Sequence, residues 1–481
     1  MQYITYKRTF KNILALNFSS ILAKFLGFFI SIIFARKLGE LYFGQLMFVF
    51  SFTGFFLVLN DFGLHSLVSR DIARNREISA KYLIEIGYLK LILSLILFLV
   101  FTGLLFLFPY SKELKSALFI GFLFVCIKSF GTFFNSFFAG FERLDINAIL
   151  DFCFTFIVFI FIVLLSNFNV LTLNSTLVAY LLSIFLWFTT GYIILRKFIS
   201  FDKVFFPKIN LNFLRESYIF ALGTISGNII LQTDVVILKF LKGDIPTGYY
   251  GVAVSFFSGL LFLTANFSNA VYPVFSRLFK ESKEDLAKYF NKTFEIFFIL
   301  ILPLSIGSSI LSEEIINFFY GKNYLPAVKS FVIILWAVFL VGIGTFFGTF
   351  LRATDRQSVL LKINIIGIIF NILSSIVFVY YLSYDGAGLS RALTLLFLAV
   401  SYYLVIVKDR NYIKMFRYLI KPAISGLLMG VIIFLLKNTF NIFLLAFIGA
   451  LSYFIFLILI RGFSKEEYNI ILSFFKRTYP A

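Results

Sequence analysis

The sequence predicts an all-α membrane protein that crosses the bilayer about 14 times. Hydrophobic residues make up 60% of its 481 residues, charged residues only 14%, and the mean hydropathy is +0.96. A soluble domain could not bury that much apolar surface. The apolar runs are continuous over about 20 residues, the length of helix that spans the hydrocarbon layer, whereas barrel strands would alternate over about ten. Helices are therefore expected throughout.

Each crossing is predicted from one apolar run between polar or basic turns. The predicted crossings are residues 11–35, 43–64, 82–108, 116–140, 146–166, 173–195, 214–239, 247–275, 289–310, 327–351, 358–382, 387–407, 417–436 and 440–461. An even number of crossings puts both termini on the same side of the membrane.

The distribution of charge predicts which side that is. The net charge is +19, and most of the 43 lysines and arginines lie in one set of alternate loops. Basic loops stay in the cytoplasm, so both termini are predicted to be cytoplasmic in a multi-pass protein of the cell (inner or plasma) membrane. This basicity reflects topology, and no nucleic-acid partner is expected. Cys126 and Cys153 both lie in apolar segments, so neither a disulfide framework nor a cysteine metal site is indicated.

Two sequence echoes predict an internal repeat. KLGELYFGQLMFVFSFTGF, containing Gly44, returns as LKGDIPTGYYGVAVSFFSGL, containing Gly251; FAGFERLDIN around Arg143 returns as LRATDRQSVL around Arg356. An even-numbered unit repeats in the same orientation, so two six-helix lobes related by a pseudo-two-fold axis along the membrane normal are expected, with a site between them. The predicted divisions are 1–200, 201–410, and 411–481 for two extra helices and a cytoplasmic tail. One chain would enclose the site, which favours a monomer.

Enzyme signatures are absent from the sequence. It contains no GxxxxGK[ST] phosphate loop, no HExxH zinc helix and no GxSxG nucleophile turn. We therefore expect no catalytic residue, metal site or cofactor. Without a nucleotide site, the energy for any transport would come from an H+ or Na+ gradient, the membrane potential or the substrate's own gradient.

Ionisable residues deep in the apolar runs are the sharpest functional signal, because a charge in mid-membrane costs about 2.5–3.5 kcal/mol even on lenient scales. Lys24 and Lys128 lie near the middle of the first and fourth crossings. They either form buried ion pairs between helices or line a water-filled cavity. Asp61 and Asp234 are the acids most expected to face the interior, and an acid beside a lysine would be a neutral pair or a proton or sodium switch.

Other charges lie closer to the predicted helix ends. Lys90, Asp151 and Glu295 are within about two turns of cytoplasmic ends, where side chains can reach the interface. Arg391, near an outer end, and Arg352, near an inner end, would serve topology alone or, for Arg352, add a cation to the site.

Polar amides form stripes along several crossings. Thr224, Asn228 and Gln232 recur every four residues, Asn266 and Asn269 are three apart, and Asn364 and Asn371 are seven apart. Each set shares one helix face. Such a stripe could form hydrogen bonds between helices, or it could form a polar cavity wall that touches a sugar. On the second interpretation, the cavity candidates are Asn228, Gln232, Asn266 and Asn364.

Several longer segments resemble a known family in order and spacing. They are ARKLGELYFGQ, DFGLHSLVSRDIAR and FFAGFERLDINAILD in the first half, and GYYGVAVSF, NAVYPVFSRLFKESKEDLAKYF, LPLSIGSSILSEEIINFFYGKNYLPA and FLRATDRQSVLLKINIIGIIFNILSSIVFVYYLSYDGAGLSRALT in the second. Across almost the whole length the chain resembles the polysaccharide or O-antigen flippases of the multidrug/oligosaccharidyl-lipid/polysaccharide exporter superfamily.

That resemblance implies a function and its partners. It implies two lobes around a central cavity, alternating access, and transfer of a polyprenyl-(di)phosphate-linked oligosaccharide to the outer leaflet, in a pathway with glycosyltransferases and a polysaccharide polymerase. Lys24, Lys128 and Arg352 would hold the phosphates. The alternatives are a lipid II flippase, a drug or cation antiporter of the same superfamily, and a membrane glycosyltransferase or polymerase.

Overall fold

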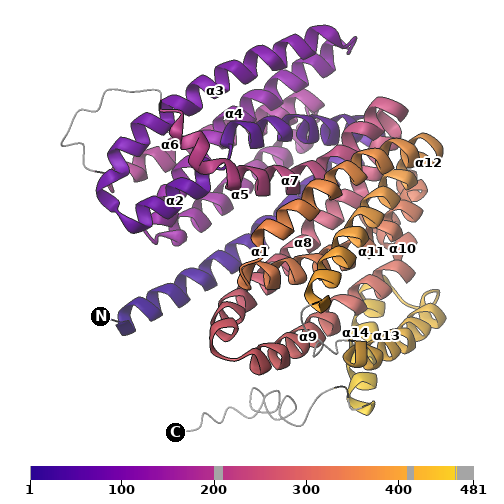
Figure 1. Ribbon diagram of the computed structural model, residues 1–481. Coiled ribbons are helices and arrows are strands. Elements are labelled where there is room, and N and C mark those ends of the chain that lie inside the picture. Colours follow the sequence, from indigo (N-terminus) through magenta and orange to yellow (C-terminus); the bar gives the residue numbers. More distant parts are fainter. Residues whose placement is uncertain (1, 200–209, 409–415, 461, 463–481) are drawn as a thin grey trace. The chain divides into compact units, whose positions relative to one another are not determined.

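Helices make up nearly all of the chain that the structure describes. The structure, a computed structural model, describes residues 2–199, 210–408, 416–460 and 462, with side chains for residues 19, 21–199, 210–408, 419–460 and 462. The helices are α1 (Gln2–Asp61), α2 (Leu64–Arg74), η1 (Arg76–Ile78), α3 (Ser79–Leu107), α4 (Lys112–Gly140), α5 (Leu144–Asn167), α6 (Leu173–Leu195), α7 (Asn212–Lys242), α8 (Asp244–Glu281), α9 (Lys283–Ile310), α10 (Ser312–Phe319), η2 (Lys322–Ala327), α11 (Val328–Ala353), α12 (Gln357–Lys408), α13 (Phe416–Leu436) and α14 (Ile442–Leu459). The described residues contain no strand (Figure 1).

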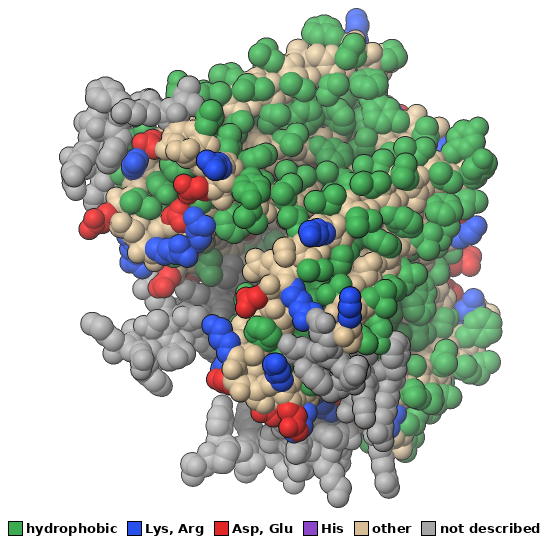
Figure 2. All heavy atoms as spheres, in the orientation of Figure 1, with side chains coloured by type: hydrophobic (Ala, Val, Ile, Leu, Met, Phe, Trp, Pro, Cys, Tyr) green, Lys and Arg blue, Asp and Glu red, His purple; other side chains and the backbone are tan. Residues whose placement is uncertain are grey.

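The all-α membrane prediction is confirmed. Twelve helices of the described chain are long and apolar enough to cross a membrane, and each of the fourteen predicted crossings falls on one of them. Figure 2 shows hydrophobic side chains over the long sides of the helices that face the viewer. Such a surface suits lipid rather than water.

Two of the helices each contain two crossings. A straight 60-residue helix such as α1 would be about 90 Å long, three times the hydrocarbon thickness. It breaks at Gly39, with φ 77° and ψ −178°, and the rings of Phe34 and Phe43 meet at 6.3 Å on either side. In α12 the break is at Ser383, where φ is 54°. Ser374 and Ser390, sixteen residues apart, are hydrogen-bonded at 2.6 Å. Both helices are therefore hairpins with single-residue turns.

Side-chain caps begin several of the other helices. Ser111 accepts a hydrogen bond from the backbone N–H of Leu114 at the start of α4, and Ser282 accepts one from Asp285 at the start of α9. Thr172 and Ser175 form a reciprocal capping box at α6. These caps satisfy N–H groups that have no partner within the helix.

The chain forms two compact units. One contains residues 1–259 and 364–391, and the other contains residues 260–363 and 392–481. The lobe boundaries predicted from the repeat, at 200 and 410, and the predicted tail beyond 462 lie outside the described residues. That division stays a prediction.

Each unit has its own core. In the first, Ile30, Val158 and Ile162 form a buried cluster that joins α1 to α5. In the second, Phe290 packs against Phe346 and Phe350 at 5.1 and 4.7 Å between ring centroids, and such pairs add about 0.5–1.5 kcal/mol each beyond area burial.

The first unit also contains a close glycine contact between helices. A Cβ on Gly44 of α1 would overlap the carbonyl oxygen of Asp244, and one on Gly248 of α8 would overlap the carbonyl oxygen of Glu40. Only glycine allows the two backbones to approach so closely. Asp244 also accepts a hydrogen bond from Gln45 at 3.2 Å and pairs with Lys239.

Candidate functional site

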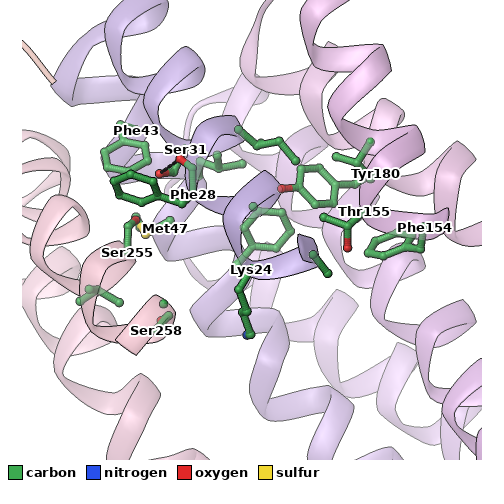
Figure 3. Close-up of a pocket in the computed structure, with 18 residues that line it drawn as sticks. Lys24, Phe28, Ser31, Phe43, Met47, Phe154, Thr155, Tyr180, Ser255 and Ser258 are labelled. Atoms are coloured by element: carbon green, nitrogen blue, oxygen red, sulfur yellow. Dashed lines mark hydrogen bonds between the residues drawn. The ribbon is translucent and has the colours of Figure 1, made fainter. Parts of the chain in front are cut away.

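A cavity of about 350 Å³ lies within the first unit. Its walls come from both halves of α1, from α5 and α6, and from the part of α8 that precedes Leu260 (Figure 3). The lining is mostly apolar and includes Phe28, Phe43 and Phe154, with Lys24 and a few hydroxyl groups as the polar exceptions. Two residues of the lining, Ile30 and Val158, also belong to the buried hydrophobic cluster of this unit. One wall of the cavity is therefore part of the packed core.

Lys24 is the charged residue of the lining. It is exposed, and in Figure 3 its side chain extends away from the rings of Phe28 and Phe43. A lysine that lines a cavity can keep its charge hydrated within the apolar span, which an isolated lysine facing lipid could not do.

Lys24 belongs to a three-charge cluster with Lys128 and Asp151. Lys128, on α4, is half-buried, and its Nζ lies 5.5 Å from the ring centroid of Phe124. Its charged neighbours are the carboxylate of Asp151 and the ammonium group of Lys24. Asp151 lies one turn before Thr155 of the cavity wall. The cluster carries a net charge of +1 when all three groups are ionised, so it favours an anion.

Hydroxyl groups supply the rest of the polarity. Ser31, Thr155 and Ser255 line the cavity, and each donates its hydrogen to a backbone carbonyl of its own helix, at 2.7, 3.1 and 2.8 Å. A serine or threonine oxygen has two acceptor lone pairs besides its O–H donor. The oxygens of Thr155 and Ser255 can therefore accept hydrogen bonds from the hydroxyl groups of a ligand.

Asp234 is placed away from this cavity. Its carboxylate, fully buried, accepts hydrogen bonds from Nε and Nη2 of Arg391 and from the hydroxyl group of Tyr250. Arg391 is 1% exposed, so it does more than set topology near a helix end. The pair joins α7 to α12 within the first unit.

Asp61 pairs with Lys90 of α3. The Nζ of Lys90 lies 3.6 Å from Oδ1 of Asp61 and donates to the carbonyl oxygen of Asn60 at 3.2 Å. Lys90 is fully buried and does not extend to the membrane interface. The carboxylate of Asp61 and the carbonyl oxygen of Asn60 stabilise its ammonium group there. Glu295, also expected near the interface, is buried and pairs with Lys292 at 3.1 Å.

Two residues of the polar stripe on α7, Asn228 and Gln232, do not line the cavity. Asn228 donates to the carbonyl oxygen of Thr224 at 3.0 Å within α7. Gln232 lies against α1, so close to Gly54 that a Cβ there would be 3.3 Å from its Nε2. Gln232 therefore packs between α7 and α1, whereas the hydrogen bond of Asn228 stays within its own helix.

The remaining candidates lie elsewhere. Asn364, half-buried on α12, belongs to the first unit but does not line the cavity. Asn266, half-buried on α8, and Arg352, exposed on α11, belong to the second unit. Arg352 donates to the hydroxyl group of Thr349 at 2.9 Å, one turn back on its helix.

Sequence reasoning did not place Asp151 and Tyr180 at the site. Asp151, Thr155 and Val158 follow the i, i+4, i+7 spacing of one helix face, so this pattern could have indicated a shared wall. Tyr180 lines the cavity from α6, between Phe50 and Phe154 at 5.0 and 6.4 Å. No pattern in the sequence singles out Tyr180, because aromatic residues occur throughout the chain.

The fold and the cavity define a class of protein: a multi-pass helical membrane protein with a largely apolar cavity that one lysine lines. A family model described as "Polysaccharide biosynthesis protein" matches residues 9–279, more than half of the chain, and a second, MatE, matches residues 220–377. The chain belongs to the polysaccharide biosynthesis protein family. It is thus a flippase or transporter of the multidrug/oligosaccharidyl-lipid/polysaccharide exporter superfamily, and not an enzyme.

Solved structures share the fold. The lipid II flippase MurJ in an inward closed conformation is 20% identical, with 93% of this chain and 99% of that chain covered and a TM-score of 0.77. An inward-facing multidrug resistance transporter of the MATE family is 14% identical, with coverages of 82% and 96% and a TM-score of 0.61.

Two curated relatives match parts of the sequence. An uncharacterized membrane protein of Methanocaldococcus jannaschii, MJ1068, is 24% identical over 77% of this chain and 78% of its own length. The lipid II flippase MurJ of Bacillus subtilis is 24% identical over 31% of this chain and 27% of its own length.

Proposed function

We propose that the protein moves a polyprenyl-(di)phosphate-linked oligosaccharide from the cytoplasmic to the outer leaflet by alternating access, during the synthesis of a cell-surface polysaccharide. The observation that carries the proposal is the cluster of Lys24, Lys128 and Asp151 at a cavity inside the membrane span, in a chain of the polysaccharide biosynthesis family. Arg352 belongs to the second unit, and its role as a further cation for the phosphates stays a prediction from the sequence.

The chemistry of such a substrate suits the cavity. A phosphate or diphosphate needs cations as it crosses a region of low dielectric, where Coulomb attraction is stronger than in water. Charge-assisted hydrogen bonds from lysines are about twice as strong as neutral ones. The hydroxyl oxygens of Thr155 and Ser255 suit the sugar, which offers many O–H donors.

Lipid II, itself a polyprenyl-diphosphate-linked glycan, is the second candidate substrate. The observation in its favour is the fold match to a lipid II flippase over 93% of this chain. A drug or cation antiporter of the same superfamily is less favoured, because the cavity cluster is positive.

An H+ or Na+ gradient is the proposed source of energy. Asp61 and Asp151 are the candidate carriers, since each carboxylate has a lysine as its neighbour. Asp234 is a poorer candidate because Arg391 binds both of its oxygens. We propose that the protein acts as a monomer with cytoplasmic termini and supplies a polysaccharide polymerase or glycosyltransferases.

The deciding experiment measures the sidedness of lipid-linked oligosaccharide in cells depleted of the protein. Wild type should restore the outer-leaflet pool, whereas Lys24→Ala/Lys128→Ala should leave at least about tenfold less, because the two principal cations are gone. The matched control is Lys112→Ala/Lys115→Ala, which removes two lysines near the start of α4 and away from the cavity; it should rescue like wild type. Unchanged sidedness on depletion, with no second flippase present, would refute the proposal.

A further inference from the structure

A second pocket, lined by α5 and α6, shares Phe154 with the cavity. We call it the α5–α6 groove: it has a volume of about 300 Å³, and Leu150, Cys153, Phe154, Leu186, Trp187 and Thr190 are among its lining residues. Leu150 and Trp187 are buried at its base, whereas Cys153 and Leu186 are exposed at its edges. Apart from one threonine and one cysteine, every lining side chain is aliphatic or aromatic.

The groove and the charged cluster share residues. Phe154 lines both the groove and the cavity. Trp187, at the base of the groove, is also a polar neighbour of the Asp151 carboxylate, which in turn neighbours Lys128. An anion-attracting cluster therefore adjoins an apolar groove, which matches the shape and charge of a phosphate joined to a hydrocarbon chain.

Apolarity alone would not select a ligand for this groove. Lipid tails are as apolar as leucine, so a free acyl chain gains no hydrophobic energy by leaving lipid for it. A chain attached to a phosphate that Lys24 and Lys128 already hold is different, because the attachment gives it a high effective concentration at the neighbouring groove. The groove can then act through shape and van der Waals contact.

We propose that the α5–α6 groove holds the isoprene units next to the phosphate of a polyprenyl phosphate substrate, while Lys24 and Lys128 of the neighbouring cluster hold the phosphate. The inference rests on the proposed function and adds a binding site for the carrier chain. The groove would keep the chain on the lipid side of Phe154 while the sugar enters the cavity.

Photo-crosslinking tests the location. The full-length protein in nanodiscs is exposed to polyprenyl phosphate that carries a diazirine on the isoprene units nearest the phosphate, and labelled peptides are mapped by mass spectrometry. Label should concentrate on groove residues such as Cys153 and Leu186. Equal labelling of lipid-facing residues on other helices, such as Leu99 of α3, would overturn the inference. So would equal labelling of the groove by phosphatidylglycerol with a tail diazirine.

Filling the groove tests its contribution to binding. Thr190→Trp should weaken binding of polyprenyl phosphate about tenfold, a factor that corresponds to about 1.4 kcal/mol and is typical of overfilling a packed site. It should leave a saturated straight-chain alkyl phosphate of the same length unaffected. Ile160→Trp, on an exposed part of α5 outside the groove, is the matched control and should bind like wild type.

The same measurements separate the two proposals. If Lys24→Ala/Lys128→Ala abolishes binding while Thr190→Trp has no effect, the groove inference fails and the proposed function stands. If polyprenyl phosphate does not bind at all, both fail.

Discussion

Arg391 donates two hydrogen bonds to Asp234, from Nε at 2.6 Å and from Nη2 at 2.7 Å, across 157 residues of sequence. Nη2 also donates to the carbonyl oxygen of Leu231 at 2.7 Å, and the guanidinium lies over the rings of Tyr250 and Phe257. A buried charge with this many partners is balanced only while every partner is present. This pair therefore stabilises the first unit more than it serves a ligand.

We expect Arg391→Met to destabilise the protein by about 3–5 kcal/mol, since it leaves Asp234 buried without its counter-ion. Thermal unfolding in detergent would show this as a lower apparent Tm. Asp234→Leu/Arg391→Met, which removes both charges, should recover much of the loss. Arg277→Met at the exposed pair with Glu281 is the control and should change little. An unchanged Tm for Arg391→Met would contradict the argument.

Lys90 and Lys24 should respond differently to the same substitution. Lys90→Met should lower the Tm strongly because it leaves Asp61 unpaired in a buried site, at a cost of about 3 kcal/mol or more. Lys24→Met should leave the Tm unchanged and reduce transport, because Lys24 is exposed in the cavity. The opposite pattern would reverse the roles assigned to the two lysines.

Gly44→Ala should separate α1 from α8. The new methyl group would overlap the carbonyl oxygen of Asp244, a backbone atom that cannot rotate away, and such overpacking costs about 1–3 kcal/mol or more. Gly103→Ala on α3 is the matched control, because nothing lies within 4 Å of its added Cβ. The measurement is the Tm of the two variants; equal values would show that the glycine contact is not needed.

Asp151→Asn should strengthen the binding of polyprenyl phosphate and slow its release. The substitution raises the net charge of the cluster from +1 to +2, which favours an anion by about 1–4 kcal/mol at the effective dielectric of a protein. Equilibrium binding and single-turnover translocation would separate the two effects. Asp145→Asn, at the pair that Asp145 forms with Arg143, is the control on the same helix. Weaker binding by Asp151→Asn would show that Asp151 orients Lys128 rather than competing with the substrate.

Most of the fold could be predicted because each membrane-spanning helix appears in the sequence as a long apolar segment. Runs of about 20 apolar residues must be helical, since no water is present to satisfy the backbone. The turns at Gly39 and Ser383 were predicted only as intervals between crossings. Their single-residue form depends on backbone angles, and Ser383 adopts a positive φ that its residue type does not suggest.

The candidate site could be predicted only in part, for a different reason. Lys24 and Lys128 were found because a charge in an apolar run is conspicuous whatever surrounds it. Asp151 as the neighbour of Lys128, and Arg391 as the partner of Asp234, depend on how helices far apart in the sequence rotate and pack. Periodicity identifies a helix face but does not say which other helix that face meets.

The breaks at Gly39 and Ser383 also bear on how the chain enters the bilayer during synthesis. Helical backbone continues on both sides of each break, so only a single-residue turn separates one crossing from the next. We expect the two segments of each hairpin to leave the insertion channel together, as a preassembled pair. A stretch of inserted polar residues at either break should then disturb biogenesis before it disturbs transport.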